Sequence, residues 1–255
     1  MDLGSLFSLH NKVAIITGGS RGIGLSIAHF YAAAGANVVI NSRNQERLDE
    51  AIAKLKEKGY QATGIVGNVG YAEDRKNLIK LTLEKYGQID ILVNNAATNP
   101  VYGPIADTDL GAFDKIFDVN LKAPYDLSIM CLPYLKQSSS ASIINVGSIS
   151  ALTPEEGLGL YSISKSALVA LTKVFAKEWG TFNIRVNAIC PGLIKTKFSK
   201  AIWSNEEVRN EFLKKLPLER MGDEDEIGAT ALFLASEASS YATGSVFTID
   251  GGFQT

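Results

Sequence analysis

The sequence contains few cysteines, and the two that are present stand far apart. Cys131 and Cys190 are the only cysteines among 255 residues, and neither belongs to a Cys-x-x-Cys pair. Isolated cysteines offer no disulfide framework, and they lack the spacing of cysteine-based metal sites. We therefore expect two buried thiols and no metal site.

An excess of positive charge is also absent. Lys and Arg number 25 against 27 Asp and Glu, which gives a formal net charge of −2. Nucleic-acid-binding proteins neutralise phosphates with clustered Lys and Arg, and here these residues are scattered. We expect no nucleic acid among the partners.

Long apolar runs are missing as well. No run reaches the roughly 20 residues that cross a bilayer. Residues 1–12 lack the charged-then-apolar pattern of a secretory signal. We therefore expect no membrane partner and a cytoplasmic location.

Short β-branched runs alternate with longer helical patterns along the chain. Strands are predicted at 13–16, 38–40, 65–66, 89–93, 143–146, 184–188 and 246–249. Several of these runs are apolar at consecutive positions, as strands buried on both faces require. Apolar residues three and four apart predict helices at 24–34, 45–58, 72–86, 110–135, 162–180 and 224–236. With right-handed crossovers, the pattern predicts one α/β domain over residues 1–255, a doubly wound Rossmann sheet of seven mainly parallel strands with helices on both faces.

One segment, residues 191–217, interrupts this alternation. Its middle, 205–215, has the pattern of an amphipathic helix. A long connection at the carboxyl edge of a sheet is typical of a lid over a substrate, although a plain helical insertion stays open. The segment and residues 99–102 would give the pocket largely apolar walls. The lid residues expected there are Phe198, Ile202, Trp203, Phe212 and Leu213.

The first predicted strand runs into a glycine-rich turn, Thr17-Gly18-Gly19-Ser20-Arg21-Gly22-Ile23-Gly24, and a helical pattern follows at once. Glycines let the backbone turn tightly and approach a pyrophosphate, and the start of the helix faces its negative charge. A tight turn alone would also account for the glycines, but the position between the first strand and the first helix favours dinucleotide binding.

The end of the second strand bears on which dinucleotide binds. Ser42-Arg43 stands where proteins that prefer NAD place an acidic residue for the ribose 2′-hydroxyl. Arg43 offers a fork suited to a 2′-phosphate, and Arg21 in the glycine turn could add a second positive charge. The sequence therefore favours NADP(H), although both arginines could instead be solvated surface residues.

Polar side chains follow the third, fourth and fifth strands. Asn68-Val69 and Asn95-Ala96 could receive the adenosine, or they could only form turns. Ser148 lies just past the fifth strand, and Tyr161 and Lys165, four residues apart, share one face of the next helix.

A phenol becomes a usable acid and base when a lysine ammonium and a cationic nicotinamide ring favour the phenolate. We predict that Tyr161 exchanges a proton with a carbonyl oxygen while Ser148 donates a hydrogen bond to it. Lys165 would hold the nicotinamide ribose. Asn120 could place a water behind Lys165 for proton exchange.

These motifs resemble those of the short-chain dehydrogenase/reductase family, over about residues 8 to 253. The Thr-Gly-x-x-x-Gly-x-Gly motif falls on residues 17–24, Asn-Asn-Ala-Gly on 94–97, and Tyr-x-x-x-Lys on 161–165. The resemblance implies Asn120, Ser148, Tyr161 and Lys165 as the catalytic residues. The cofactor-binding residues expected are Gly18, Ser20, Arg21, Gly22, Ile23, Gly24, Ser42, Arg43, Asn68, Val69, Asn95, Ala96, Tyr161, Lys165, Pro191, Gly192, Ile194 and Thr196.

Two positions depart from the common pattern of that family. Ala97 stands where glycine is usual, and Asn68 where an aspartate generally meets the adenine. Neither change removes a catalytic group, so the affinity for the cofactor is what they put in question.

The resemblance is greatest to NADP(H)-dependent carbonyl reductases and 3-oxoacyl reductase-like members. It implies a homotetramer that reduces a ketone or aldehyde, or oxidises the corresponding secondary alcohol. A silent NADP(H)-binding sensor, an NAD-dependent sugar-acid dehydrogenase, and a lyase or epimerase on the same fold remain as alternatives. A sensor would be expected to lose part of the Ser148, Tyr161 and Lys165 set, and extended epimerases generally need a larger C-terminal domain.

Overall fold

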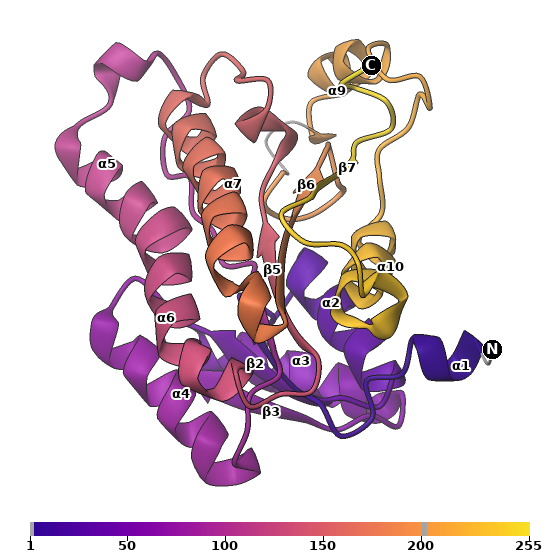
Figure 1. The fold of residues 1–255 in the computed structure, drawn as a ribbon. Helices are drawn as coiled ribbons and strands as arrows, with labels where there is room; N and C mark the ends of the chain where they lie inside the picture. Colours follow the sequence, from indigo (N-terminus) through magenta and orange to yellow (C-terminus); the bar gives the residue numbers. More distant parts are fainter. Residues whose placement is uncertain (1–2, 200–202) are drawn as a thin grey trace.

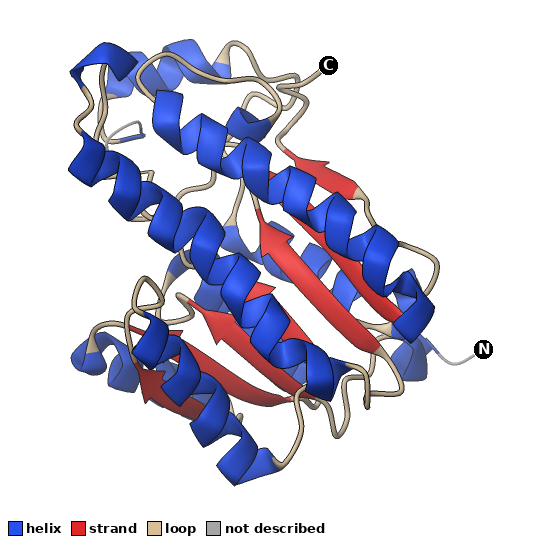
Figure 2. Ribbon diagram, turned by 60° about the vertical axis from the view of Figure 1, so that its left-hand side comes forward, coloured by secondary structure: helices blue, strands red, loops and turns tan. Residues whose placement is uncertain are grey.

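A computed structural model describes residues 3–199 and 203–255 of the chain. Within these residues, seven strands form one sheet in the order β3-β2-β1-β4-β5-β6-β7, and every neighbouring pair is parallel (Figures 1 and 2). The strands are β1 Val13–Thr17, β2 Asn37–Ser42, β3 Ala62–Val66, β4 Ile91–Asn94, β5 Ala141–Val146, β6 Ile184–Pro191 and β7 Val246–Ile249. This doubly wound Rossmann order confirms the predicted fold, and the sheet is wholly rather than mainly parallel.

Helices cover both faces of the sheet (Figure 2). They are α1 Leu3–Leu6, α2 Gly22–Ala33, α3 Gln45–Glu57, α4 Ala72–Tyr86, α5 Leu110–Phe117, α6 Ala123–Leu135, α7 Gly159–Trp179, α9 Glu206–Leu213 and α10 Glu224–Ala235. Each of the seven predicted strands and each main predicted helix has its counterpart here.

The alternation of side chains along the strands divides the core into two layers. Ile16 and Ile40 face α2, α3 and α10, whereas Ile15 and Val39 face α4, α6 and α7. Because successive residues of a strand point to opposite faces, a strand covered on both sides must be apolar throughout. All five residues of β1 are buried, as this requires.

Several helix boundaries differ from the predictions by one to three residues, and two helical segments differ in ways that bear on the site. Helix α7 begins at Gly159, three residues before the predicted start, and its N-cap residue Leu158 makes no side-chain cap hydrogen bond. Without a capping side chain, the sequence carries no mark of the true beginning. The predicted helix over 110–135 contains a π-helical turn, Asp118–Lys122, between α5 and α6.

The loops that leave the carboxyl ends of the strands gather at one edge of the sheet, and the lid segment lies there. Helix α9 stands above this edge, close to the C-terminus (Figure 1). The Phe212 ring of α9 stacks on Phe253 with ring centroids 5.2 Å apart. This contact ties the lid to the end of the chain.

Among the described helices, none is both long and apolar enough to cross a membrane.

Candidate functional site

A cavity of about 1060 Å³ opens at the carboxyl edge of the sheet. Its size matches the upper end of ordinary ligand pockets, roughly 300 to 1,000 Å³. All the predicted cofactor-binding residues line this cavity, from Gly18 in the glycine turn to Thr196 in the lid. Ser148, Tyr161 and Lys165 lie in the same lining. One space therefore holds both the glycine turn and the predicted reacting groups.

The glycine turn has a backbone conformation and a close packing that side chains at its glycine positions would disturb. Gly18 and Gly22 have φ angles of +64° and +58°, which L side chains rarely adopt. A Cβ on Gly24 would lie 2.5 Å from the side-chain nitrogen of Asn95 and from the Gly18 main-chain oxygen. The turn thus passes directly into α2, whose first amides face the cavity. This cradle fits a pyrophosphate at the start of a helix.

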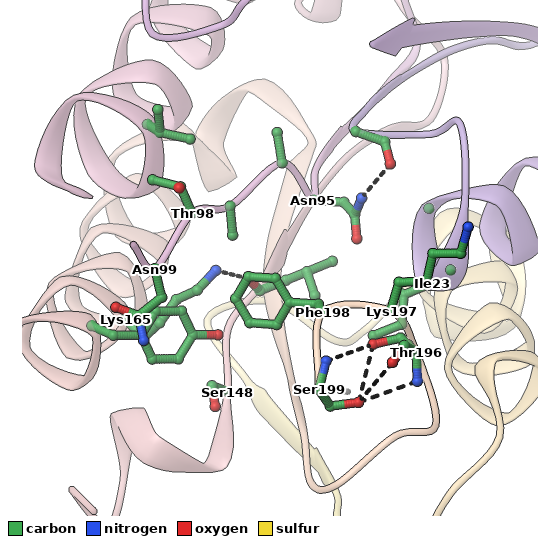
Figure 3. A pocket seen from close by; sticks show the side chains of 18 of the residues that line it. Ile23, Asn95, Thr98, Asn99, Ser148, Lys165, Thr196, Lys197, Phe198 and Ser199 are labelled. Carbon is green, nitrogen blue, oxygen red and sulfur yellow. Dashed lines mark hydrogen bonds between the residues drawn. The ribbon is translucent and has the colours of Figure 1, made fainter. Parts of the chain in front are cut away.

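The Asn95 side chain holds the turn from the neighbouring strand. Its amide donates to the main-chain oxygens of Thr17 and Gly18, at 2.9 and 3.1 Å (Figure 3). The Thr17 hydroxyl in turn accepts from the amides of Asn95 and Ala96. Asn95 was predicted to contact a cofactor, and its side chain is already engaged in supporting the turn.

Three arginines lie near the glycine turn and the end of β2. Arg21, Arg43 and Arg47 all line the cavity. Burial lowers the pKa of Arg21 below its usual value, and the charges of Arg47 and Arg43 lower that pKa further. Below them, the Ser20 hydroxyl donates to Ser42 at 2.9 Å. Three positive charges held close together in this way can bind an anion.

Arg47 was missed by the sequence analysis. It lies near the start of α3, where its own amide donates to the Asn44 cap. From the sequence alone, Arg47 is indistinguishable from the other charged residues of an amphipathic helix. Its distance of four residues from Arg43, across a capped helix start, was the available signal.

Lys165 and Tyr161 project from one face of α7 toward the end of β5. The Lys165 ammonium donates to the Val146 main-chain oxygen at 2.7 Å and lies 5.8 Å from the Tyr161 ring centroid. Both residues are buried, at 2% and 8% exposure. Figure 3 shows Lys165 and Ser148 in the same part of the site. The four-residue spacing therefore places these groups together as predicted.

Burial shifts the pKa values of Tyr161 and Lys165 in the directions that favour the neutral form of each group. It raises the pKa of Tyr161 to about 12, although a hydrogen bond with Ser148 acts in the lowering direction. Burial likewise lowers the pKa of Lys165 to about 8. At neutral pH the phenol is therefore protonated and ready to act as an acid. Its use as a base would require a further positive charge beside it.

Asn120 lies behind the wall of the cavity and not in its lining. Its side-chain oxygen accepts from the Thr98 amide at 2.8 Å, and its amide donates to Thr98 and to Ser164. It sits within the π-helical turn and is fully buried. Its side chain thus joins the loop after β4 to α7, and the water behind Lys165 stays a prediction.

The lid segment forms the roof of the cavity. The Thr196 amide donates to the Ser199 hydroxyl at 3.2 Å (Figure 3). Trp203 donates its indole N–H to the Thr196 main-chain oxygen at 2.7 Å. The Phe198 ring, 53% exposed, lies 6.0 Å from the Tyr161 ring. Of the predicted lid residues, Phe198 and Phe212 line the cavity, Trp203 and Leu213 do not, and Ile202 lies outside the described residues.

The wall nearest Ser148 contains a carboxylate that the sequence analysis also missed. Glu155 lines the cavity and accepts a hydrogen bond from Ser150 at 3.1 Å. Apolar side chains line the cavity as well, namely Tyr102, Ile149, Leu158, Phe198 and Phe212. The loop that carries Tyr102 is pinned to this wall, because the Gly103 amide donates to Gly157 at 3.1 Å.

Comparison with known proteins supplies a family for this site. Residues 18–254 match the family model described as enoyl-(acyl carrier protein) reductase. The chain is 45% identical over 244 residues to "Dehydrogenase/reductase SDR family member 4" of Oryctolagus cuniculus, covering 96% of this chain and 94% of the relative. The match spans the glycine turn, Ser148, Tyr161 and the lid together.

Solved structures of similar proteins share the whole fold. Gluconate 5-dehydrogenase from Burkholderia cenocepacia J2315, in complex with NADP and tartrate, has a TM-score of 0.93 at 29% identity over 99% of both chains. A 7α-hydroxysteroid dehydrogenase, in complex with NADH and 7-oxo glycochenodeoxycholic acid, has a TM-score of 0.94 at 31% identity over 99% of this chain and 98% of that one. The chain belongs to the short-chain dehydrogenase/reductase family of oxidoreductases.

Proposed function

We propose that this protein is an NADP(H)-dependent oxidoreductase that reduces a ketone or aldehyde, or oxidises the corresponding secondary alcohol. The observation that carries the proposal is the presence of Ser148, Tyr161 and Lys165 in the same cavity as the glycine turn. A dinucleotide laid from the arginines to Tyr161 would bring its nicotinamide beside the one buried phenol that the described residues contribute to this lining.

Tyr161 acts as the proton donor in the reduction. Its raised pKa keeps the phenol protonated at neutral pH, so a proton is available as negative charge grows on the carbonyl oxygen. Ser148 hydrogen-bonds the same oxygen and stabilises that charge. A bound nicotinamide supplies the hydride in this direction and accepts it in the other.

Lys165 serves the reaction in two ways. Its ammonium, now on the Val146 oxygen, lies where it can bind the ribose hydroxyls beside the nicotinamide. Its positive charge favours the phenolate of Tyr161, which alcohol oxidation requires. A pKa of about 8 leaves Lys165 mostly charged at neutral pH.

The three arginines favour NADP(H) over NAD(H). A 2′-phosphate would meet the guanidinium groups of Arg21, Arg43 and Arg47, whose clustering is costly until an anion is present. No acidic side chain from the end of β2 lines this part of the cavity. The fold by itself does not decide the matter, because the two similar dehydrogenases were solved with NADP and with NADH.

The substrate wall favours a neutral, largely apolar carbonyl compound. Five aromatic or aliphatic side chains line the cavity together with Glu155, whose negative charge would repel a substrate carboxylate. An NAD-dependent sugar-acid dehydrogenase is the second candidate, and the similarity to a gluconate 5-dehydrogenase is what speaks for it.

We also infer a homotetramer, in which helices α5, α6 and α7 supply one interface. These helices bury one side against the sheet and still carry large apolar side chains on the other. The exposed residues are Leu110, Phe113, Tyr125, Ile129, Ile163 and Val174, here called the helical patch. An apolar surface of this kind on a water-soluble fold is typical of an interface.

A substrate screen tests the proposal. Purified protein is offered ketones, 3-oxoacyl thioesters and sugar acids, with NADPH or NADH, and consumption of the cofactor is followed at 340 nm. We expect turnover of neutral carbonyl compounds with NADPH. Turnover of sugar acids with NAD alone would support the second candidate. Tight binding of NADPH without turnover of any class would favour the sensor.

A further inference from the structure

A row of three side chains leads from the reacting centre into the substrate wall. The Ser148 hydroxyl donates to Ser150 at 3.2 Å, and the Ser150 hydroxyl donates to a Glu155 carboxylate oxygen at 3.1 Å. The Ser150 amide also donates to the Ser148 hydroxyl at 3.2 Å. Ser150 is only 2% exposed, so water competes little for these contacts.

The chemistry of the three groups fixes the direction of this row. An ionised carboxylate can only accept hydrogen bonds, so Ser150 must give its single proton to Glu155. The Ser150 oxygen is then an acceptor, and without a substrate Ser148 points its proton toward it. When a substrate binds, this proton turns to the carbonyl oxygen, while the Ser150 amide keeps its bond to the Ser148 oxygen. The position of Glu155 thus determines, through Ser150, the orientation of the Ser148 hydroxyl.

We propose that Glu155, acting through Ser150, is a positioning residue that holds the Ser148 hydroxyl in its place beside Tyr161. The inference rests on the proposed function, because it assigns Ser148 the carbonyl oxygen as its partner. It explains why a carboxylate stands in an otherwise apolar wall. Without Ser150 or Glu155, the Ser148 side chain could turn away and lose part of its contact with the reacting oxygen.

The same carboxylate acts on Tyr161 through its charge. The groups that bear on the Tyr161 phenol are Glu155 from the substrate wall, Cys190 at the end of β6, Ser148, and Lys165 on α7. Glu155 raises the pKa of the phenol, since a negative charge nearby disfavours the phenolate. Glu155→Gln removes the negative charge and keeps an oxygen that can accept from Ser150. This variant therefore separates the effect of the charge on Tyr161 from the effect of the hydrogen-bonded row on Ser148.

Three variants and one control test the inference. Ser150→Ala and Glu155→Ala each break the row, and we expect kcat to fall about fivefold to tenfold, the size expected for one lost hydrogen bond, with KM changed less than threefold. Glu155→Gln keeps an acceptor and should retain at least half of the wild-type kcat. Glu156→Gln changes the exposed neighbouring carboxylate and should match wild type.

Wild-type kcat in Ser150→Ala, or equal losses in Glu155→Gln and Glu155→Ala, would overturn the inference. If the wild-type protein turns over no carbonyl compound, the proposed function fails instead, and an ultraviolet titration decides the inference without substrate. The phenolate absorbance near 295 nm, taken as the difference between each protein and its Tyr161→Phe counterpart, reports the pKa of Tyr161. This pKa should rise in Ser150→Ala, because a Ser148 side chain that turns away no longer lowers it through its hydrogen bond, and it should stay constant in Glu156→Gln. An unchanged value in Ser150→Ala would overturn the inference.

Discussion

Asn95 supports the glycine turn by donating its side-chain amide to the main-chain oxygen of Gly18, at 3.1 Å. A second bond from the same amide reaches Thr17, so one side chain joins the end of β4 to the turn after β1. These contacts hold the backbone of the turn and do not involve the side chains of Arg43 or Arg47.

We therefore expect Asn95→Ala to weaken NADPH and NADH alike. The loss of two bonds to the turn should raise both dissociation constants by about tenfold, corresponding to roughly 1.4 kcal/mol. Fluorescence titration of the protein with each cofactor measures this. A loss confined to NADPH would show that Asn95 acts at the ribose instead.

Replacing the arginines, unlike replacing Asn95, should weaken the binding of NADPH much more than that of NADH. We expect Arg43→Ala and Arg47→Ala each to weaken NADPH by about 10- to 150-fold, since a hydrogen bond to a charged group contributes roughly 1.5–3 kcal/mol. The affinity for NADH should change less than threefold, because NADH lacks the 2′-phosphate. Lys56→Ala, at the exposed far end of α3, is the matched control.

Equal losses for the two cofactors in Arg43→Ala would contradict the preference for NADP(H). If Arg43→Ala weakens NADPH and Arg47→Ala does not, Arg47 does not contact the 2′-phosphate, and the preference for NADP(H) depends on Arg43.

The order of the strands and most of the cofactor site could be predicted from the sequence, because they depend on patterns local in the chain. Runs such as Ile15-Ile16 show burial on both faces, and the glycine turn stands between a strand and a helix. The four-residue spacing of Tyr161 and Lys165 likewise survives any shift of the helix start. These features need no knowledge of distant contacts.

What could not be predicted depends on which loops meet in space. Arg47 and Glu155 are ordinary charged residues in sequence, and only the packing of the turn and loops brings them into the cavity. The bonds that join Asn120 to Thr98 and Ser164 were likewise not visible in the sequence. Partners of a polar side chain follow from tertiary structure, which a local pattern does not encode.

The raised pKa of Tyr161 predicts different pH dependences for the two directions of the reaction. Because this pKa is about 12 in the protein alone, the phenol is protonated across pH 6 to 9. Carbonyl reduction, which needs the phenol, should not gain from rising pH. Alcohol oxidation needs the phenolate and should accelerate, by up to about tenfold per pH unit below the pKa of the complex. Initial rates in both directions between pH 6 and 10 test this, and an oxidation rate that falls with pH would contradict it.

The helical patch predicts how the oligomer can be broken. Leu110→Glu together with Ile129→Glu places two charges on residues that are 80% and 40% exposed in one chain, so the fold should survive while the interface does not. We expect a tetramer for wild type and a smaller species for the variant by light scattering after gel filtration. Leu81→Glu, on α4 and outside the patch, should leave the mass unchanged. A wild-type monomer would refute the inferred assembly.

The removal of one oxygen atom tests the central claim most directly. Tyr161→Phe deletes the hydroxyl and leaves the ring that packs near Phe198. Turnover of a carbonyl compound identified in the screen is measured for wild type and variant at neutral pH, alongside NADPH binding. The account predicts that kcat falls by about 10²- to 10⁴-fold while the dissociation constant for NADPH changes little. Near-wild-type turnover in Tyr161→Phe would contradict it.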